Sequence, residues 1–447
     1  MTEVQSPFAP SYLPADDALR LTLHNEVHAR PQAGIAMPAL VVYVAVLNEG
    51  VSREQEGAHL RQLPGQADLN LERLQGNFLR LQLAGYTLKW ERHSEFTRYS
   101  LVQPLPAHAL LGAVEPELLG ALVVPAVWLQ SIPGRTMAAI KVAMVHGNLG
   151  EPEATLAQAQ AWFGPQPIVA SLMGSGGHSW AVTDFMLRPG GFERMLVIGP
   201  QDTSPTRAGR VSQRLLELET YRLMALRGLP VAKELAPLLA QAEAQLADIT
   251  AQLENKSAAD QDLLDTLVSL SARVERATAS HVYRFSATRA YHALVAQRIA
   301  ELREQTIPGT QTLGEFMQRR LSPAMATVAA TEQRLASLSE RVARASALLR
   351  TRVDIVTESQ NQQLLAKLTR GQEMQLHLQT TVEGLSIAAI SYYVISLLLY
   401  GAKALKAGGL PVNPELAAGA LIPLVLWAVW SATRRIHHSV VKLSQHR

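Results

Sequence analysis

Residues 384–402 read GLSIAAISYYVISLLLYGA and contain no charged side chain. A helix needs about 20 largely apolar residues to cross a bilayer, so this run predicts a membrane span. A second uncharged run lies between Glu415 and Arg434 and predicts another span at about 416–433. The two runs together predict a transmembrane hairpin over residues 383–436.

Pro423 lies inside the second run and leaves an alternative open, in which both runs are buried core helices. A membrane helix tolerates proline where neighbouring groups satisfy the freed backbone carbonyl. Aromatic residues, which are enriched at membrane interfaces, occur in both runs, among them Tyr392, Tyr400 and Trp430. We therefore favour the hairpin over the pair of core helices.

Basic residues flank the two runs unevenly. Two precede the first run, four follow the second, and only Lys403 and Lys406 lie between them. Cytoplasmic flanks carry the excess of Lys and Arg, so both termini are predicted to be cytoplasmic, with residues 437–447 as a basic tail. The first ten residues, MTEVQSPFAP, contain no apolar stretch and predict no secretory signal. The lipid bilayer is thus the first predicted partner, through the hairpin.

Residues 204–382 carry helical patterns almost without interruption and predict a stalk domain. Breaks are expected at 228–230, 307–309 and 322–323, where glycine or proline occurs. The last helix would run on into the first span for about 80 residues, on the order of 120 Å, with Gly371 as its weakest point. Two series of residues recur every three or four positions and predict buried helix faces: Leu263, Leu267, Leu270, Val274, Ala277, His281, Phe285 and Thr288, and then Leu335, Leu338, Val342, Ala345, Leu349 and Val353. We interpret this domain as coiled-coil-like and self-associating.

Residues 1–203 have a different pattern, in which short apolar runs are separated by glycine, proline and asparagine. The pattern predicts a cytosolic α/β domain with a mainly antiparallel or mixed sheet. Strands are expected at 40–46, 78–90, 96–102, 138–145, 180–187 and 195–198, and helices at 116–122 and 153–163. The fold class is therefore α+β, with a mixed α/β sheet domain, a long helical stalk and a two-helix transmembrane hairpin.

Composition narrows the function. A chain of 447 residues is too long for one core and fits two or three units. The absence of cysteine excludes disulfides, thiolate metal sites and cysteine nucleophiles. A net charge of only +3 offers no extended basic field, so nucleic acid is not a predicted partner.

One polar stretch, LHNEVHARP at 23–31, contains His24, Glu26, His28 and Arg30. On a strand these four side chains would share one face, and on a helix His24 and His28 would lie one turn apart. Either geometry could present two imidazoles and a carboxylate to a metal or another ligand.

A second stretch, WERHSE at 90–95, supplies three further candidate ligand-binding residues, Glu91, His93 and Glu95. The plainer interpretation is structural, with Glu91 and Glu95 pairing with the cations of the first stretch and tying the N-terminal arm to the sheet. No catalytic residue is predicted, because no nucleophile motif occurs and GSGGHS at 174–179 lacks the lysine of a P-loop. The sequence assigns no cofactor and no metal.

Five stretches resemble an uncharacterised family of bacterial membrane-anchored proteins, classed as a domain of unknown function. They are HNEVHARP at 24–31, WERHSEF at 90–96, LRTRVD at 349–354, ESQN at 358–361 and VEGLSIAAISYY at 382–393. The resemblance covers nearly the whole chain. It implies a protein of the bacterial inner membrane and supplies no activity.

The layout also resembles, in architecture alone, the CorA-type magnesium channels, which combine a cytosolic α/β domain, long helices and a C-terminal two-span hairpin. Those channels carry Gly-Met-Asn at the far end of their first span, whereas this chain has Tyr400, Gly401, Ala402 and Lys403 there. A lysine at a pore mouth repels cations and argues against magnesium conduction.

Two functions fit these features. The first is a membrane-anchored, cytosolic-facing scaffold or sensor that is oligomeric and binds a ligand or a protein partner. The second is an ion channel or transporter with a cytosolic gating domain. We favour the first, because the long helices and the hairpin come without a catalytic motif; an enzyme would need a metal or a nucleotide at the histidine row.

Overall fold

The computed structural model describes residues 17–20, 23, 34–109, 111, 122–255, 259–409 and 413–444, with side chains as far as Arg435. The chain divides into two compact units. The first unit comprises Met1–Asn255 and Asp265–Ala345, and the second comprises Lys256–Leu264 and Ser346–Arg447. The predicted domain limits at residues 203 and 382 stay predictions.

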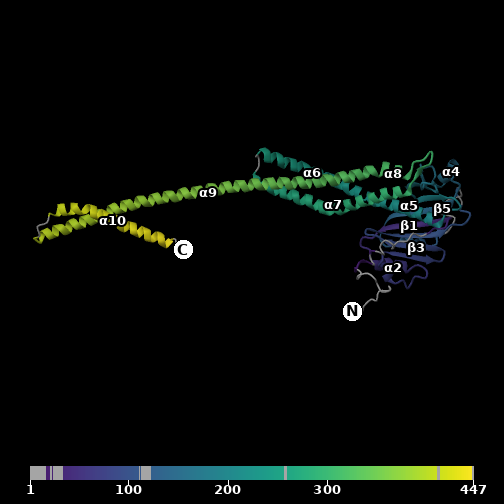
Figure 1. Ribbon diagram of the computed structural model, residues 1–447, viewed down its shortest axis with the longest axis horizontal. Coiled ribbons are helices and arrows are strands. Elements are labelled where there is room, and N and C mark those ends of the chain that lie inside the picture. Colours follow the sequence, from purple (N-terminus) through teal and green to yellow (C-terminus); the bar gives the residue numbers. More distant parts are fainter. Residues whose placement is uncertain are drawn as a thin grey trace. The chain divides into compact units, whose positions relative to one another are not determined.

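A nine-stranded sheet lies in the first unit (Figure 1). Its order is β2-β3-β4-β1-β5-β8-β7-β6-β9, and the β5–β8 pair is parallel whereas the other neighbours are antiparallel. This confirms the predicted mixed sheet. The strands are β1 (Ala39–Leu47), β2 (Phe78–Leu83), β3 (Tyr86–Arg92), β4 (Phe96–Pro104), β5 (Arg135–His146), β6 (Val169–Met173), β7 (Ser179–Leu187), β8 (Glu193–Gly199) and β9 (Gln305–Thr306).

The single strand predicted at 78–90 was wrong, because the chain forms the hairpin β2–β3 there. Gly85 takes a φ of +83°, which glycine adopts without the steric cost of a side chain. The remaining predicted strands are confirmed, while β6 and β9 were not foreseen. The helix expected at 153–163 is confirmed as α4 (Pro152–Phe163). The helix expected at 116–122 lies, apart from Leu122, outside the described residues.

Both faces of the sheet are covered. The even-numbered residues of β1, such as Leu40 and Val44, belong to one apolar core cluster with side chains of α2 (Arg53–Leu60), α3 (Ala126–Gln130) and α4. On the opposite face, Tyr43 contacts α5 (Pro205–Leu226), where its hydroxyl lies 2.8 Å from that of Thr220. Side chains alternate across a strand, so β1 contributes to both layers.

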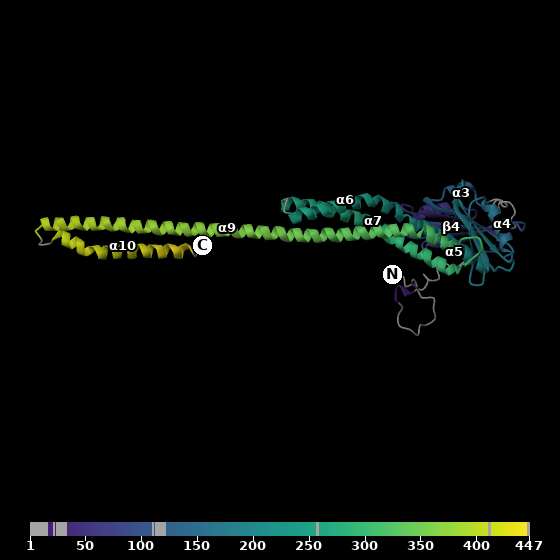
Figure 2. The same ribbon diagram turned by 90° about the horizontal axis from the view of Figure 1, so that it is seen from above.

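Long helices follow α5 in the first unit. α6 (Gly228–Asn255), α7 (Asp260–Leu302) and the first part of α9 (Ser322–Ala407) lie alongside one another (Figures 1 and 2). Arg334 of α9 binds Glu243 of α6 at 2.8 Å. The predicted breaks are confirmed, since α5 ends before Gly228, α7 ends at Leu302, and α8 (Leu313–Arg320) precedes α9.

The predicted buried faces of these helices are largely confirmed. In the first series every residue is buried except His281, which is half-buried. In the second series Ala345 and Val353 are half-buried and the other four residues are buried.

In the second unit, α9 passes Gly371 without a break, and α10 (Pro414–Ser444) then runs back in the opposite direction (Figures 1 and 2). Both helices contain a stretch long and apolar enough to cross a membrane. Only 6% and 11% of the two stretches are buried, so neither is a core helix of the kind that the alternative interpretation required.

Candidate ligand-binding site

The structure separates the predicted site residues. His24, Glu26, His28 and Arg30 lie outside the described residues, so their predicted roles stay predictions. Glu91 lies in β3, whereas His93 and Glu95 lie in the turn between β3 and β4.

The turn explains why Glu91, His93 and Glu95 do not form one site. Alternate residues share a face only while the chain stays extended, and β3 ends at Arg92, after which the backbone N–H of His93 donates to the carbonyl of Phe96. The His93 ring stacks on the Phe96 ring with 4.5 Å between centroids. Glu95 instead forms ion pairs with Arg284 and, at 3.9 Å, with Arg227.

Glu91 lies deep in the first unit and binds two cations. Its Oε2 accepts from Nε of Arg98 at 2.6 Å and lies 3.1 Å from Nζ of Lys89. Burial by itself would raise the pKa of the Glu91 carboxyl, but these two cations outweigh it and hold the pKa at about 2. Glu91 is therefore ionised at neutral pH. Its partners among the described residues come from the sheet itself, on β3 and β4.

The register of the strands creates this group of charges. Glu91 pairs directly with Arg98 across β3 and β4, and Lys89 pairs with Arg80 of β2 on its other side. Residues at alternate positions point to the same face, so Lys89 and Glu91 project together toward α5.

The charges extend from the sheet into the helices. Arg98, with only 4% of its surface exposed, also contacts Glu217 of α5 at 3.3 Å. Glu217 in turn binds Arg298 of α7 at 2.6 Å. Buried ion pairs barely repay their desolvation cost, so such a network is weak evidence for stability alone.

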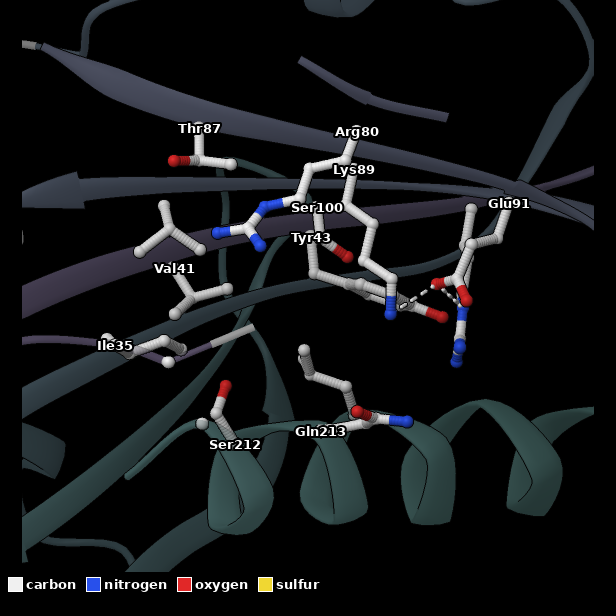
Figure 3. A pocket seen from close by; sticks show the side chains of 15 residues that line it. Ile35, Val41, Tyr43, Arg80, Thr87, Lys89, Glu91, Ser100, Ser212 and Gln213 are labelled. Atoms are coloured by element: carbon white, nitrogen blue, oxygen red, sulfur yellow. Dashed lines mark hydrogen bonds and ion pairs between the residues drawn. The ribbon is translucent and has the colours of Figure 1, made fainter. Parts of the chain in front are cut away.

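A cavity of about 70 Å³ lies beside this network, between strands β1–β4 and α5 (Figure 3). Arg80, Lys89 and Glu91 line it from the sheet, and Ser212 and Gln213 line it from α5 (Figure 3). Burial lowers the pKa of Lys89, although the neighbouring Glu91 opposes that effect. Burial also raises the pKa of Tyr43, another lining residue, to about 12, so its hydroxyl stays neutral.

Two buried polar atoms of residues that line the cavity have no hydrogen-bond partner among the described residues. They are Oγ of Ser212 and Oε1 of Glu91, each in a residue with 1% of its surface exposed. A buried polar atom left without a partner costs roughly 1–3 kcal/mol. Ser212 points into the cavity (Figure 3), so a molecule there could satisfy its hydroxyl.

A wider hollow, of about 590 Å³, lies near His93 and is lined by Arg53 and Arg92. Nη2 of Arg53 donates to Asn77 at 2.7 Å, and Nη1 of Arg92 lies 2.8 Å from Glu56, while the buried Nε of Arg53 has no hydrogen-bond partner among the described residues. We take the cavity beside Glu91 as the candidate site because it is the more enclosed of the two and contains a residue predicted from the sequence.

Sequence reasoning found Glu91 but missed Lys89, Arg98, Arg80 and Ser212. A signal was present, since charged residues recur at alternate positions of β3, where a strand beneath a helix would ordinarily be apolar. Ser212 carried no comparable signal, because its burial depends on how α5 packs on the sheet. Within the described parts of the chain, no group of three His, Asp or Glu side chains is arranged to hold a metal ion.

The sequence matches a known protein family. A family model described as "Protein of unknown function (DUF3422)" matches residues 15–440. This confirms the resemblance to an uncharacterised family. No curated protein and no solved structure matches the chain.

Proposed function

The chain belongs to the DUF3422 family, and we propose that it is a membrane-anchored sensor whose cavity between the sheet and α5 binds a small polar ligand. The family description assigns no activity, so the proposal rests on the site. The observation that carries it is the pair of buried, unpartnered polar atoms, Ser212 Oγ and Glu91 Oε1, in the wall of a cavity large enough for several water molecules.

The anchor in this proposal consists of the apolar stretches of α9 and α10. Their length, their composition and their exposure support a position in the inner membrane. The excess of Lys and Arg outside the turn between them supports cytoplasmic termini, which would place the cavity on the cytoplasmic side.

Self-association through α9 is the second part of the proposal. Val356, Leu364, Leu368, Leu378 and Val382 have between 43% and 63% of their surfaces exposed. At 100° per residue they fall on one side of the helix, because each interval between them is a sum of three- and four-residue steps. We call these five residues the α9 stripe.

A second copy of the chain is the occupant that fits the α9 stripe best. Two copies anchored in one membrane with the same orientation would present identical stripes side by side, in parallel and at the same height. Parallel helices bury such stripes against each other in coiled coils. The scaffold role predicted from the sequence would follow from this pairing.

The ligand part of the proposal is tested by thermal unfolding of the full-length protein in detergent, with a panel of small metabolites. We expect at least one compound to raise the unfolding temperature of the wild type by mass action. The variant Ser212→Leu, which fills the cavity, should unfold normally without ligand and lose that response. A panel that affects neither protein, or both equally, would contradict the proposal.

A further inference from the structure

The side chains around the cavity carry more positive than negative charge, which restricts the chemical class of ligand that can bind there. Three cations, Arg80, Lys89 and Arg98, line it, whereas the carboxylates that contact them are Glu91 and Glu217. Arg298, which also contacts Glu217, shares Glu301 with Arg214, at 2.7 Å and 3.5 Å. The network therefore contains more cations than carboxylates, and Arg80 is the cation in the cavity wall that has no carboxylate partner among the described residues.

Arg80 is the cation with spare hydrogen-bonding capacity. Its guanidinium points into the cavity (Figure 3), and no hydrogen bond or ion pair joins it to another side chain in the described ranges, although Arg80 is exposed and water can reach it. Lys89 has one carboxylate partner at 3.1 Å, although an ammonium group offers three donors. These two side chains can donate to an anion in the cavity, and Ser212 lines the same cavity from α5.

Glu91 adds a second requirement. Its Oε2 serves both Arg98 and Lys89, while its buried Oε1 accepts no hydrogen bond from a described residue. A ligand that satisfies Oε1 must donate a hydrogen bond, because an ionised carboxylate can only accept.

We propose that the cavity binds a small organic monocarboxylate with a neighbouring hydroxyl or amino donor, the carboxylate toward Arg80 and Lys89 and the donor toward Glu91. This inference rests on the proposed sensor function and names the ligand class for the same site. A single negative charge pairs with Arg80, the lining cation that has no carboxylate partner among the described residues, whereas a dianion would add repulsion from Glu91. The cavity has room for roughly five water-sized groups, which is the size of the simplest such acid, glycolate.

The test is isothermal titration calorimetry of the full-length protein in detergent, dialysed first to remove any ligand that it carries, with three matched probes. Glycolate carries both groups, acetate lacks the donor, and ethylene glycol lacks the carboxylate. We expect glycolate to bind at least tenfold more tightly than acetate, and ethylene glycol to give no measurable heat.

Two variants test whether glycolate binds in the cavity. Arg80→Gln should weaken glycolate at least tenfold, and since Arg80 is exposed the unliganded protein should unfold at the wild-type temperature. Arg73→Gln, at another exposed arginine outside the cavity, should bind glycolate like the wild type.

The other outcomes separate the two proposals. Equal binding of glycolate and acetate would overturn the donor requirement, and equal binding of glycolate and ethylene glycol would overturn the carboxylate requirement. A different metabolite whose effect Ser212→Leu abolishes, with no response to glycolate, would overturn this ligand class and leave the sensor function standing. No response to any compound would contradict both.

Discussion

At the scale of single residues, the buried charges beside the cavity allow the clearest prediction of a change in the free energy of unfolding. Glu91 is the shared partner of Lys89 and Arg98, and all three lie largely out of water. Removing one member of a buried ion pair leaves uncompensated charge, which typically costs about 3–5 kcal/mol.

We therefore expect Glu91→Gln to lower the free energy of unfolding by about 3 kcal/mol, measured by thermal unfolding with tryptophan fluorescence. The control is Glu49→Gln, which breaks an ion pair with Arg135 whose side chains are 81% and 73% exposed. Exposed pairs contribute at most about 1 kcal/mol, so this variant should differ little from the wild type. If the two variants lost equal free energy of unfolding, the buried network would contribute no more stability than an exposed ion pair.

A second residue-scale prediction concerns Glu193, on the strand β8. Burial, followed by repulsion from the neighbouring Glu219, raises the pKa of Glu193 to about 8. The folded protein thus retains a proton that the unfolded chain releases near pH 4.5. The stabilisation from this proton is complete below pH 4.5 and is lost as the pH rises to about 8.

Glu193→Gln removes this titration, because an amide stays neutral. Relative to the wild type, the variant should gain on the order of 2 kcal/mol between pH 5 and pH 8, measured as the difference between unfolding curves at the two values. Glu153→Gln, at an exposed position of α4, should show no such pH-dependent gain. If the free energy of unfolding of Glu193→Gln and of the wild type changed equally between pH 5 and pH 8, the titration of Glu193 would not be the cause of the pH dependence.

At the scale of elements, the sequence predicted best where one face repeats over many turns. The series from Leu263 to Thr288 was long enough to average out exceptions such as the half-buried His281. The β2–β3 hairpin was missed because apolar alternation resumes directly after the two-residue turn, shifted by one position, and Gly85 was the only turn residue that marked it. β9, with only Gln305 and Thr306, has no pattern of its own and exists through its pairing with β6.

The α9 stripe gives the element-scale prediction. We expect Leu364→Ser with Leu368→Ser to reduce the mass of the detergent-solubilised protein, measured by light scattering, toward that of one chain. Leu365→Ser with Leu376→Ser is the matched control, since these leucines are equally exposed, at 62%, but lie on another side of α9. The same loss of mass in both double variants would contradict pairing through the stripe.

At the scale of the whole molecule, the order of sheet, long helices and apolar helices was predictable because each has a distinct periodicity and composition. The cavity was not, because it depends on residues from β2, β3, β4 and α5 that only the fold brings together. Glu91 was found because it belongs to the polar stretch WERHSE at 90–95, whereas Ser212 matters only through its burial.

The proposed orientation can be tested by cysteine labelling. The chain contains no cysteine, so a single introduced cysteine is the only site that a maleimide can label. We expect a membrane-impermeant maleimide to label Ala407→Cys, near the turn between α9 and α10, in intact cells with a permeable outer layer. Ser175→Cys, exposed in the turn between β6 and β7, should be labelled only after the membrane is disrupted. The reverse pattern would invert the orientation, and labelling of both in intact cells would argue against a membrane anchor.

A small ligand held in the cavity between the sheet and α5 should be carried through purification and can be identified directly. Freshly purified full-length protein would be denatured and the released small molecules quantified by mass spectrometry, for the wild type and for Ser212→Leu. We predict that the wild type releases one small organic anion in an amount close to one per chain and that Ser212→Leu releases none. Release of nothing from the wild type, or of the same compound in equal amounts from both proteins, would show that the cavity is not a ligand site.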